Sequence, residues 1–290
     1  MIQDSRIYEA IKNLGNEAKL EVLEASVKIF EGEQNEFVAQ FPPIVENLSY
    51  GQHARQVLDI YVPELNDKTT LKPVLVWVHG GGFVRGGKSN KLNPFEAHIG
   101  RFAARHDMIG VTMNYRLAPE FVWPAGGEDV GAAISWLRHN ISTYGGDPDA
   151  IYIMGTSAGA CHISTYLRLF PETRDISGAI MLSGLYGYTA LDARDLPYYN
   201  GVEEIYASTL PFSKALESDL PLFIACAGFD PIRFQTETLL LLNDIFAIRG
   251  KIQGSCILSG HNHYSMSLHI GGPDTRLSDQ ILSFIKTTRF

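Results

Sequence analysis

The residues best suited to covalent chemistry form a short motif, Gly-Thr-Ser-Ala-Gly, at positions 155–159. The motif follows the apolar run 150–154 and precedes a helical pattern, which predicts a sharp turn between a strand and a helix. Such a turn holds the hydroxyl of Ser157 clear of the sheet, and the helix that follows directs free N–H groups at a developing oxyanion. Ser157 is therefore the candidate nucleophile. The alternative is that Gly155 and Gly159 merely turn a strand into a helix.

A run of glycines supplies a second candidate component of this chemistry. Residues 79–83 read His-Gly-Gly-Gly-Phe, directly after an apolar run. Successive glycines cost conformational entropy, and they make sense where backbone N–H groups must approach a ligand closely. We expect an oxyanion hole formed by the N–H groups of Gly81 and Gly82, joined by that of Ala158. His79 is expected to anchor this loop rather than to do chemistry, and a flexible surface loop is the alternative interpretation.

A serine hydroxyl becomes a good nucleophile when a histidine takes its proton and a carboxylate orients that histidine. In a strand–turn–helix site the three residues follow in the order serine, acid, histidine. Asp230 follows the apolar run 221–227, so it should lie at the carboxyl end of a strand, where this architecture places its sites. Its rivals, Asp192, Asp195 and Asp219, lie in an irregular stretch or before a strand. The alternative role for Asp230 is a helix cap.

Three histidines, His261, His263 and His269, follow the last apolar run and are candidates for the base. We favour His263, which precedes a tyrosine and a serine that could open a helix or turn, and we keep His261 as the alternative. A metal site at the His-Asn-His pair lacks a cysteine or carboxylate at ligand spacing, so we expect no metal. Because a base needs a neutral imidazole, whose ordinary pKa is about 6.5, activity should rise from about pH 6 to 8.

The elements that position these residues can be predicted from periodicity. Six short runs are apolar on both faces, as buried parallel strands are, at 73–78, 108–113, 150–154, 177–182, 221–227 and 251–258. Helical patterns occur at 94–106, 126–143, 158–170, 232–249 and 274–287. This alternation predicts an α/β fold whose mostly parallel, doubly wound central sheet carries helices on both faces. Segment 55–62 alternates polar and apolar residues, as an antiparallel strand would.

We expect residues 1–290 to form a single domain with a helical cap. Residues 1–31 have helical periodicity broken at Gly15 and Asn16, and we expect the segment 1–45 to contribute to the cap. The stretch 184–216 breaks the strand–helix rhythm and should be an insertion over the carboxyl edge of the sheet. Its tyrosines either line an aromatic substrate pocket or pack the cap; they are Tyr186, Tyr188, Tyr198 and Tyr199.

The composition bounds the classes of partner. The 290 residues include 24 Lys and Arg against 32 Asp and Glu, and this acidic balance argues against nucleic acid. No run reaches the roughly 18 apolar residues that a membrane span requires. We expect Cys161, Cys226 and Cys256 to be reduced core thiols, and the N-terminus lacks the pattern of a secretory signal. Together these features favour the cytoplasm.

Taken together, the motifs resemble the α/β-hydrolase superfamily, in particular its HGGG-type (hormone-sensitive-lipase-like) carboxylesterases and lipases. The resemblance spans about residues 55–287, in the family's order, and is carried by HGGGF (79–83), NYRLAPEFVWPAGGED (114–129), YGGDPDAIYIMGTSAG (144–159), GFDPI (228–232) and NHYS (262–265). It implies a triad of Ser157, Asp230 and His263, an oxyanion hole at Gly81, Gly82 and Ala158, and no cofactor or metal. Two features depart from the family pattern: Thr156 replaces the usual acidic residue, and Phe234 follows Arg233 where a basic–acidic pair is typical.

The function implied by this resemblance is that of a serine hydrolase, which cleaves carboxylic esters of small to medium acyl or aryl groups through an acyl-enzyme intermediate. The glycine loop and the NHYS ending are also similar to kynurenine formamidase and feruloyl-esterase-like relatives, so an amidase or arylformamidase is the alternative. A non-catalytic binding protein on the same fold is a minor alternative. The expected partner is a small-molecule ester or amide. We expect Arg116 and Asp129 to be a structural pair, and the edge strand 252–258 is a candidate for pairing in a homodimer.

Overall fold

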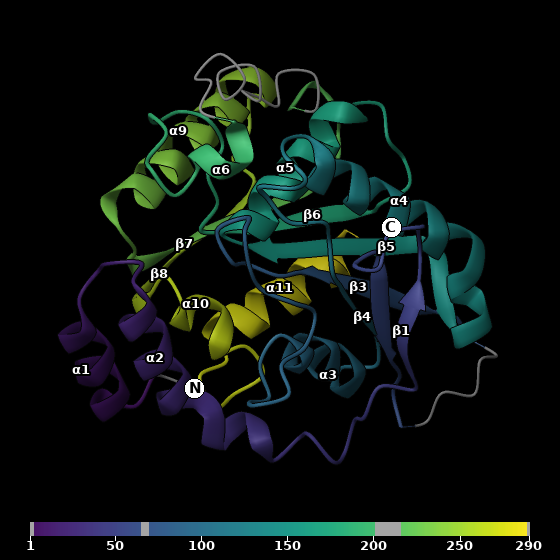
Figure 1. Cartoon of the computed structure of the whole chain (residues 1–290), viewed down its shortest axis with the longest axis horizontal. Coiled ribbons are helices and arrows are strands. Elements are labelled where there is room, and N and C mark those ends of the chain that lie inside the picture. The colour runs from purple at the N-terminus through teal and green to yellow at the C-terminus, as the bar shows by residue number, and fades with distance from the viewer. Residues whose placement is uncertain (1–2, 65–69, 201–215, 289–290) are drawn as a thin grey trace.

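The computed structural model describes residues 3–64, 70–200 and 216–288, which form a layered α/β structure (Figure 1). Its centre is one eight-stranded sheet in the order β1-β2-β4-β3-β5-β6-β7-β8. The strands are β1 (Val45–Ser49), β2 (Val57–Tyr61), β3 (Lys72–Val78), β4 (Ile109–Met113), β5 (Gly146–Thr156), β6 (Gly178–Leu182), β7 (Leu222–Phe229) and β8 (Gly254–Asn262). The α/β fold class predicted from the apolar runs is thereby confirmed.

The strand pairings divide the sheet into an antiparallel edge and a parallel remainder. β2 pairs antiparallel with β1 and β4, and every pairing from β4 to β8 is parallel. The antiparallel strand expected at 55–62 is β2. No strand was expected at β1, whose residues are half-buried or exposed at the edge of the sheet and carry only a weak alternation signal.

Both faces of the parallel strands are buried, which explains why their sequences are apolar throughout. In β3, Val74 and Val76 face one core cluster, whereas Leu75 and Trp77 face the other. The first cluster is covered by α4 (Ala125–Asn140), α5 (Ala158–Leu169) and α9 (Ile232–Arg249), and the second by α3 (Ala97–Arg105) and α11 (Arg276–Thr287) (Figure 1). A short 3-10 helix, η1 (Ile141–Tyr144), continues α4.

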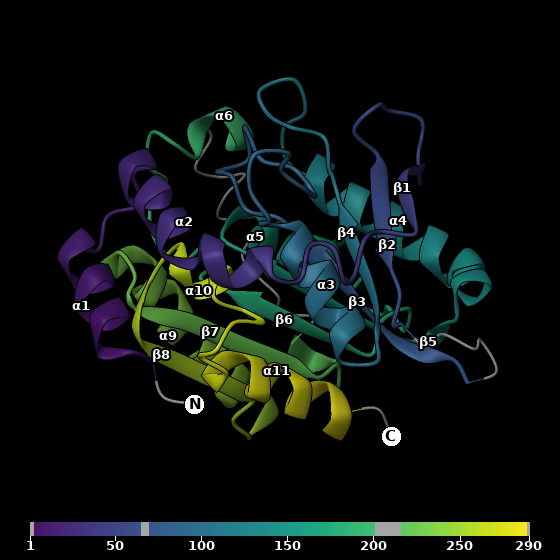
Figure 2. The same cartoon turned by 90° about the horizontal axis from the view of Figure 1, so that it is seen from below.

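Two helices at the N-terminal end of the chain lie at the carboxyl edge of the sheet (Figures 1 and 2). α1 (Ser5–Leu14) and α2 (Leu20–Asn35) are separated at Gly15, as expected, where the backbone has a φ of 76°. α1 lies beside β8, and α2 lies beside the short helix α10 (Ser265–Leu268). The buried Gln34 side chain donates from Nε2 to the carbonyl oxygens of Leu268 and Ile270, at 3.2 and 2.9 Å.

The stretch that breaks the strand–helix rhythm is described up to residue 200 and contains the short helix α6 (Leu196–Tyr199). Its residues 201–215 lie outside the described residues. Tyr198 and Tyr199 are buried, and the ring of Phe83 stacks on that of Tyr198 with centroids 4.5 Å apart. This part of the expected insertion therefore packs onto the loop that follows β3.

The last strand differs from expectation in its position. The apolar run predicts a strand at 251–258, but β8 extends through Ser259, Gly260, His261 and Asn262. These residues carry no strand signal of their own, yet they continue the ladder because Phe229 of β7 pairs with Asn262. His261 thus belongs to the strand rather than to the loop after it. No helix of the described residues is long and apolar enough to cross a membrane.

We predict opposite effects on stability for two glycine-to-alanine substitutions. A Cβ at Gly110 in β4 would lie 2.3 Å from the Gly100 carbonyl oxygen of α3, so Gly110→Ala forces the helix off the sheet. It should lower the free energy of unfolding by about 2–4 kcal/mol. A Cβ at the exposed Gly32 of α2 meets no atom within 4 Å, so Gly32→Ala should raise it by about 0.5–1 kcal/mol. Urea unfolding of both variants tests the pair, and equal effects would contradict it.

Candidate active site

The turn between β5 and α5 holds Ser157 in a strained backbone conformation. Its φ is 52°, which a residue with a side chain rarely adopts. A Cβ at Gly159 would lie 2.0 Å from the carbonyl oxygen of Val78, and a Cβ at Gly155 would lie 2.8 Å from the carbonyl carbon of Gly159. Both flanking positions therefore require glycine, because a side chain at either would collide with the neighbouring backbone.

The structure brings the other two sequence-predicted residues to Ser157. The Nε2 atom of His263 lies 3.0 Å from Ser157 Oγ, and its Nδ1 atom lies 2.7 Å from Asp230 Oδ1. With a proton on Nδ1 donated to the carboxylate, Nε2 is free to accept the serine proton. Asp230 is fully buried and His263 is 5% exposed, so this chain of hydrogen bonds is shielded from water except at the serine end.

Ser183, which the sequence did not single out, helps to hold the acid. Its hydroxyl donates to Asp230 Oδ2 at 2.6 Å, and the backbone N–H of Ala227 donates to the same oxygen at 2.7 Å. One carboxylate oxygen is thus fixed by these donors while the other faces His263. Ser183 follows β6 at the carboxyl edge with a φ of 47°, a placement that no local motif indicates.

The glycine loop presents unused N–H groups beside the serine. Gly81 has a φ of 132°, and a Cβ there would lie 2.0 Å from the Arg85 carbonyl oxygen. Gly81, Gly82 and Ala158 line the same cavity as Ser157. Within the described part of the chain, the backbone N–H groups of these three residues donate to no protein acceptor. An oxyanion formed at Ser157 would satisfy them.

His79 lies beneath this loop and is fully buried. Its ring stacks on that of Tyr115 with centroids 4.2 Å apart, and its Nδ1 bonds the Gly80 carbonyl oxygen at 2.6 Å. The Tyr115 hydroxyl donates to the His79 carbonyl oxygen at 3.0 Å. Burial lowers the pKa of His79 to about 3, so the ring is neutral. These contacts agree with the expected anchoring role.

Two basic side chains hold the far end of the loop. Lys88 Nζ lies 2.6 Å from Asp59 Oδ1 in a buried ion pair, and Arg55 donates from Nη2 to the Gly86 carbonyl oxygen at 3.0 Å. Both contacts tie the loop to β2 and the segment before it. The loop is therefore fixed at both ends before any ligand arrives, which reduces the entropy lost on binding.

Arg116 and Asp129 form the structural pair that was expected. The Asp129 carboxylate is fully buried and accepts hydrogen bonds from Arg116, from the backbone N–H at 2.7 Å and from Nε at 2.8 Å. Gln56 donates to the same carboxylate at 2.8 Å. Neither Arg116 nor Asp129 lines the cavity at Ser157.

His261, the alternative base, makes a separate set of contacts. Its Nε2 lies 3.2 Å from Asp274 Oδ2 and its Nδ1 lies 3.1 Å from Ser265 Oγ, and the ring is fully buried beside Phe30. It therefore bonds neighbouring residues rather than Ser157. Among the described residues, no cluster of three or more histidines, cysteines or carboxylates could hold a metal ion.

A cavity of about 480 Å³ opens at Ser157 and His263. Its apolar wall includes Leu23, Val27, Phe95, Leu185, Phe234 and Leu268, so both α2 and the stretch after β6 contribute to it. The four tyrosines named from the sequence are absent from its lining. Tyr186, Tyr198 and Tyr199 are buried in the core, and Tyr188 donates to Asp244 at 2.6 Å. Of the two roles considered for these tyrosines, the structure supports packing.

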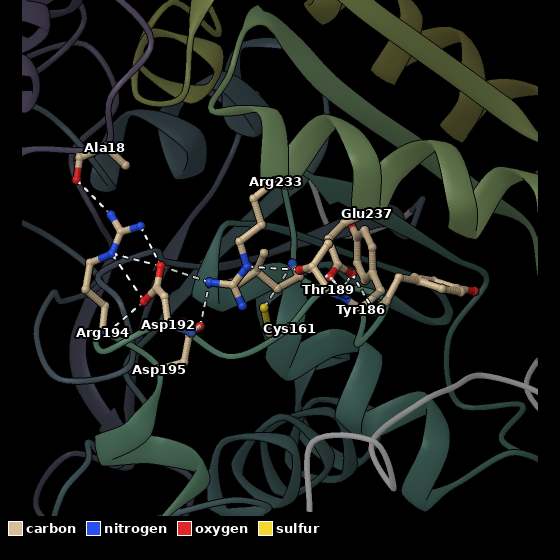
Figure 3. Close-up of polar contacts among 11 residues, drawn as sticks. Ala18, Cys161, Tyr186, Thr189, Asp192, Arg194, Asp195, Arg233 and Glu237 are labelled. Carbon is tan, nitrogen blue, oxygen red and sulfur yellow. Dashed lines mark hydrogen bonds and ion pairs between the residues drawn. The ribbon is translucent and has the colours of Figure 1, made fainter. Parts of the chain in front are cut away.

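Arg233 is the hub of a polar network at the cavity (Figure 3). Its Nη1 lies 2.6 Å from Asp195 Oδ2 and 3.0 Å from Asp192 Oδ2. Its Nε donates to Thr189 Oγ1 at 3.0 Å. Two of the three aspartates that rivalled Asp230 as the acid, Asp192 and Asp195, are therefore partners of Arg233. Through them the start of α9, just after Asp230, is tied to the residues before α6.

The same network reaches the N-terminal helices (Figure 3). Arg194 lies 2.7 Å from Asp192 Oδ2, and its Nη1 donates to the Ala18 carbonyl oxygen, between α1 and α2, at 3.2 Å. Glu237 of α9 accepts from the backbone N–H of Thr189 at 2.7 Å. Segments that are far apart in the sequence are thus joined around the cavity. No sequence signal indicated this network, because its bonds depend on tertiary proximity.

Comparison with known proteins agrees with this geometry. Residues 57–197 match the family model described as "Carboxylesterase family". A probable carboxylic ester hydrolase, LipM, of Mycobacterium tuberculosis is 35% identical over 158 residues, covering 50% of this chain and 35% of LipM. Isoprenylcysteine alpha-carbonyl methylesterase ICME of Arabidopsis thaliana is 37% identical over 132 residues, covering 46% of this chain and 29% of ICME. The chain therefore spans about a third of the length of these curated relatives.

Solved structures match nearly the whole chain. An esterase/lipase from an uncultured bacterium superposes with a TM-score of 0.70 at 19% identity, covering 99% of each chain. Esterase B of Lactobacillus rhamnosis superposes with a TM-score of 0.69 at 19% identity, covering 93% of this chain and 95% of its own. The chain has the α/β-hydrolase fold, and the resemblance to α/β-hydrolase carboxylesterases drawn from its motifs is confirmed.

We predict that Arg233→Met destabilises the protein by about 3–5 kcal/mol, because it leaves the buried Asp195 carboxylate without its cation. Breaking an exposed ion pair should change the free energy of unfolding little. Arg6→Met, which breaks the surface pair with Asp4, is therefore the matched control. Urea unfolding at neutral pH measures both variants. A loss with Arg233→Met no larger than that of the control would contradict the assignment of Arg233 as a hub.

Buried histidines should make the protein acid-sensitive. Burial lowers the pKa of His79 and His162 to about 3 and that of His98 to about 4. Below pH 6.5 each histidine takes a proton in the unfolded state but not in the folded state, so stability falls as the pH falls toward 4. The loss is about 1.4 kcal/mol per pH unit for each such histidine.

The slope of unfolding free energy against pH, measured from pH 7 to 5, tests this prediction. His98→Gln should reduce the slope by one histidine's share, whereas the same substitution at the exposed His139 should leave it unchanged. A slope unaffected by His98→Gln would show that burial does not hold this ring neutral.

Proposed function

We propose that this chain is a serine carboxylic-ester hydrolase of the HGGG type, which cleaves esters of small to medium acyl or aryl groups. The observation that carries the proposal is the continuous hydrogen-bonded chain from Ser157 through His263 to Asp230, beside three unused backbone N–H groups. The names of the relatives, a carboxylic ester hydrolase and a methylesterase, support the same reaction.

In the first half of the reaction, Ser157 Oγ attacks the ester carbonyl carbon while His263 Nε2 takes the serine proton. The negative charge that develops on the carbonyl oxygen is stabilised by the N–H groups of Gly81, Gly82 and Ala158. Asp230 holds the histidine in the correct tautomer and stabilises its charged form. His263 then gives the proton to the leaving alcohol, and an acyl-enzyme remains on Ser157.

In the second half, water occupies the place of the alcohol. His263 Nε2 takes a proton from the water as the water oxygen attacks the acyl carbonyl, and the same N–H groups stabilise the oxyanion. The proton returns to Ser157 Oγ as the acid leaves. The described triad and backbone donors supply every proton transfer and charge contact in these steps.

The cavity favours substrates of limited size. Its volume of about 480 Å³ lies in the lower part of the range of small-molecule sites, roughly 300–1,000 Å³. We assign the chain to a single domain in which the segment 1–45 and the insertion at 184–216 form a cap over this cavity. Ala18 and Leu23 on one side and Leu185 and Arg194 on the other line it, which supports the assignment.

We also place the protein in the cytoplasm and infer a homodimer. Cys161, Cys226 and Cys256 are free thiols, as in reducing compartments. β8 is the last strand of the sheet and exposes Ile257 to 70%, which supports pairing with a second copy. The net charge of −8 supports a small-molecule substrate rather than nucleic acid.

We predict that Ser157→Ala lowers ester hydrolysis by about 10⁴-fold or more, because it removes the nucleophile. Steady-state rates on p-nitrophenyl acetate, butyrate, octanoate and decanoate measure the effect, and the optimum chain length sizes the cavity. Ser142→Ala, at an exposed position of η1, is the matched control and should keep the wild-type rates. Labelling by a fluorophosphonate should likewise require Ser157.

An N-formyl aryl amide added to the same series separates the alternative activities. If wild type alone cleaves this amide while esters are slow in both proteins, the triad acts in an arylformamidase. If wild type and Ser157→Ala show the same rate on every substrate, and the fluorophosphonate labels neither protein, the chain is a binding protein on a hydrolase fold. Rapid, serine-dependent turnover of short esters supports the esterase.

A further inference from the structure

Glu96 is an acidic residue in the wall of the catalytic cavity that the reaction described above does not use. It directly precedes α3, where a side chain often caps the helix, but its carboxylate makes no capping bond. Its φ and ψ are 65° and −57°, a conformation that costs a residue with a side chain free energy. The chain thus maintains a strained residue at the cavity without using it to cap the helix.

Only one of the two oxygens of the Glu96 carboxylate has a hydrogen-bond partner among the described residues. Trp77 Nε1 donates to Oε2 at 2.6 Å, and this bond fixes the orientation of the group. Across residues 3–64, 70–200 and 216–288, the second oxygen, Oε1, has no hydrogen-bond partner. Burial raises the pKa of Glu96 to about 7, and the hydrogen bond from Trp77 offsets only part of this rise. A ligand that bonded Oε1 would supply the missing contact.

The charges around the cavity decide what kind of ligand suits Glu96. Arg85 and Lys91 line the cavity, are exposed, and form no ion pair with any residue that the structure describes. These cations disfavour a cationic ligand. A neutral hydroxyl avoids that repulsion, and it donates to a carboxylate or accepts from a carboxylic acid, so it pairs with either form of Glu96.

We propose that Glu96 is a specificity-determining residue, which binds a hydroxyl group carried by the ester substrate. The site would therefore prefer hydroxylated esters to the matching esters without the hydroxyl. This inference rests on the proposed esterase function. The hydroxyl belongs to either the alcohol or the acyl half of the ester, and each half has its own test substrate.

Two matched substrate pairs test the proposal by titration of the released acid. The first is the monobutyrate of propane-1,3-diol against propyl butyrate, and the second is ethyl 6-hydroxyhexanoate against ethyl hexanoate. In the wild type, kcat/KM should be about tenfold higher for the hydroxylated member of at least one pair, as loss of a hydrogen bond to a charged group predicts. In Glu96→Leu this ratio should fall to about one.

Two further variants separate recognition from folding. Glu96→Gln keeps a carbonyl oxygen for Trp77 and should give an intermediate ratio, so the test does not depend on Glu96→Leu being well folded. Glu172→Gln, in the exposed turn after α5, should keep the wild-type ratio. If no wild-type preference exists, or if Glu96→Leu keeps the whole preference, Glu96 serves only to orient Trp77 and the proposal is overturned.

Hydrolysis of p-nitrophenyl butyrate distinguishes this failure from failure of the proposed function. If the wild type hydrolyses it and shows no preference for hydroxylated esters, only the role of Glu96 is wrong. If the wild type hydrolyses no ester at all, the esterase function and the inference that rests on it both fail.

Discussion

The packing of Gly159 against the carbonyl oxygen of Val78, which leaves no room for a Cβ, is the constraint on which the rest of the candidate active site depends. β3 and β5 are parallel neighbours, with Val78 opposite Gly155. Because both chains leave the sheet at the same level, the glycine loop after β3 and the turn after β5 emerge side by side. The backbone N–H groups of the glycine loop and the hydroxyl of Ser157 are therefore adjacent because of strand register, before any other side chain contributes.

Strand order also brings Asp230 and His263 close to Ser157. Asp230 follows β7 and His263 follows β8, and these are neighbouring strands. Ser183, directly after β6, donates to the carboxylate oxygen of Asp230 that His263 does not use. Four successive strand ends, β5 to β8, thus supply one connected line of hydrogen bonds.

Features that depend on local sequence were predictable from it. The parallel strands, the elbow glycines and the chemical candidates Ser157, Asp230 and His263 each carry a pattern that follows from sterics or reactivity. The end of β8 was not predictable, because His261 and Asn262 are polar and join the ladder only through pairing with β7. Ser183 and Glu96 could not be found either, because their partners, Asp230 and Trp77, are distant in the sequence.

The hydrogen bond that joins Arg194 to position 18 has a consequence for how this cavity can diversify. Arg194 bonds the main-chain carbonyl oxygen of Ala18, a group that every amino acid carries, while residue 18 also lines the cavity. The attachment of residue 18 to Arg194 is therefore independent of the side chain at position 18. A bulkier residue at position 18 would shorten the space available to a substrate without cutting the link between the two parts of the wall. Selection, natural or in the laboratory, can thus tune the size of the cavity at this position while Ser157, Asp230 and His263 stay in place.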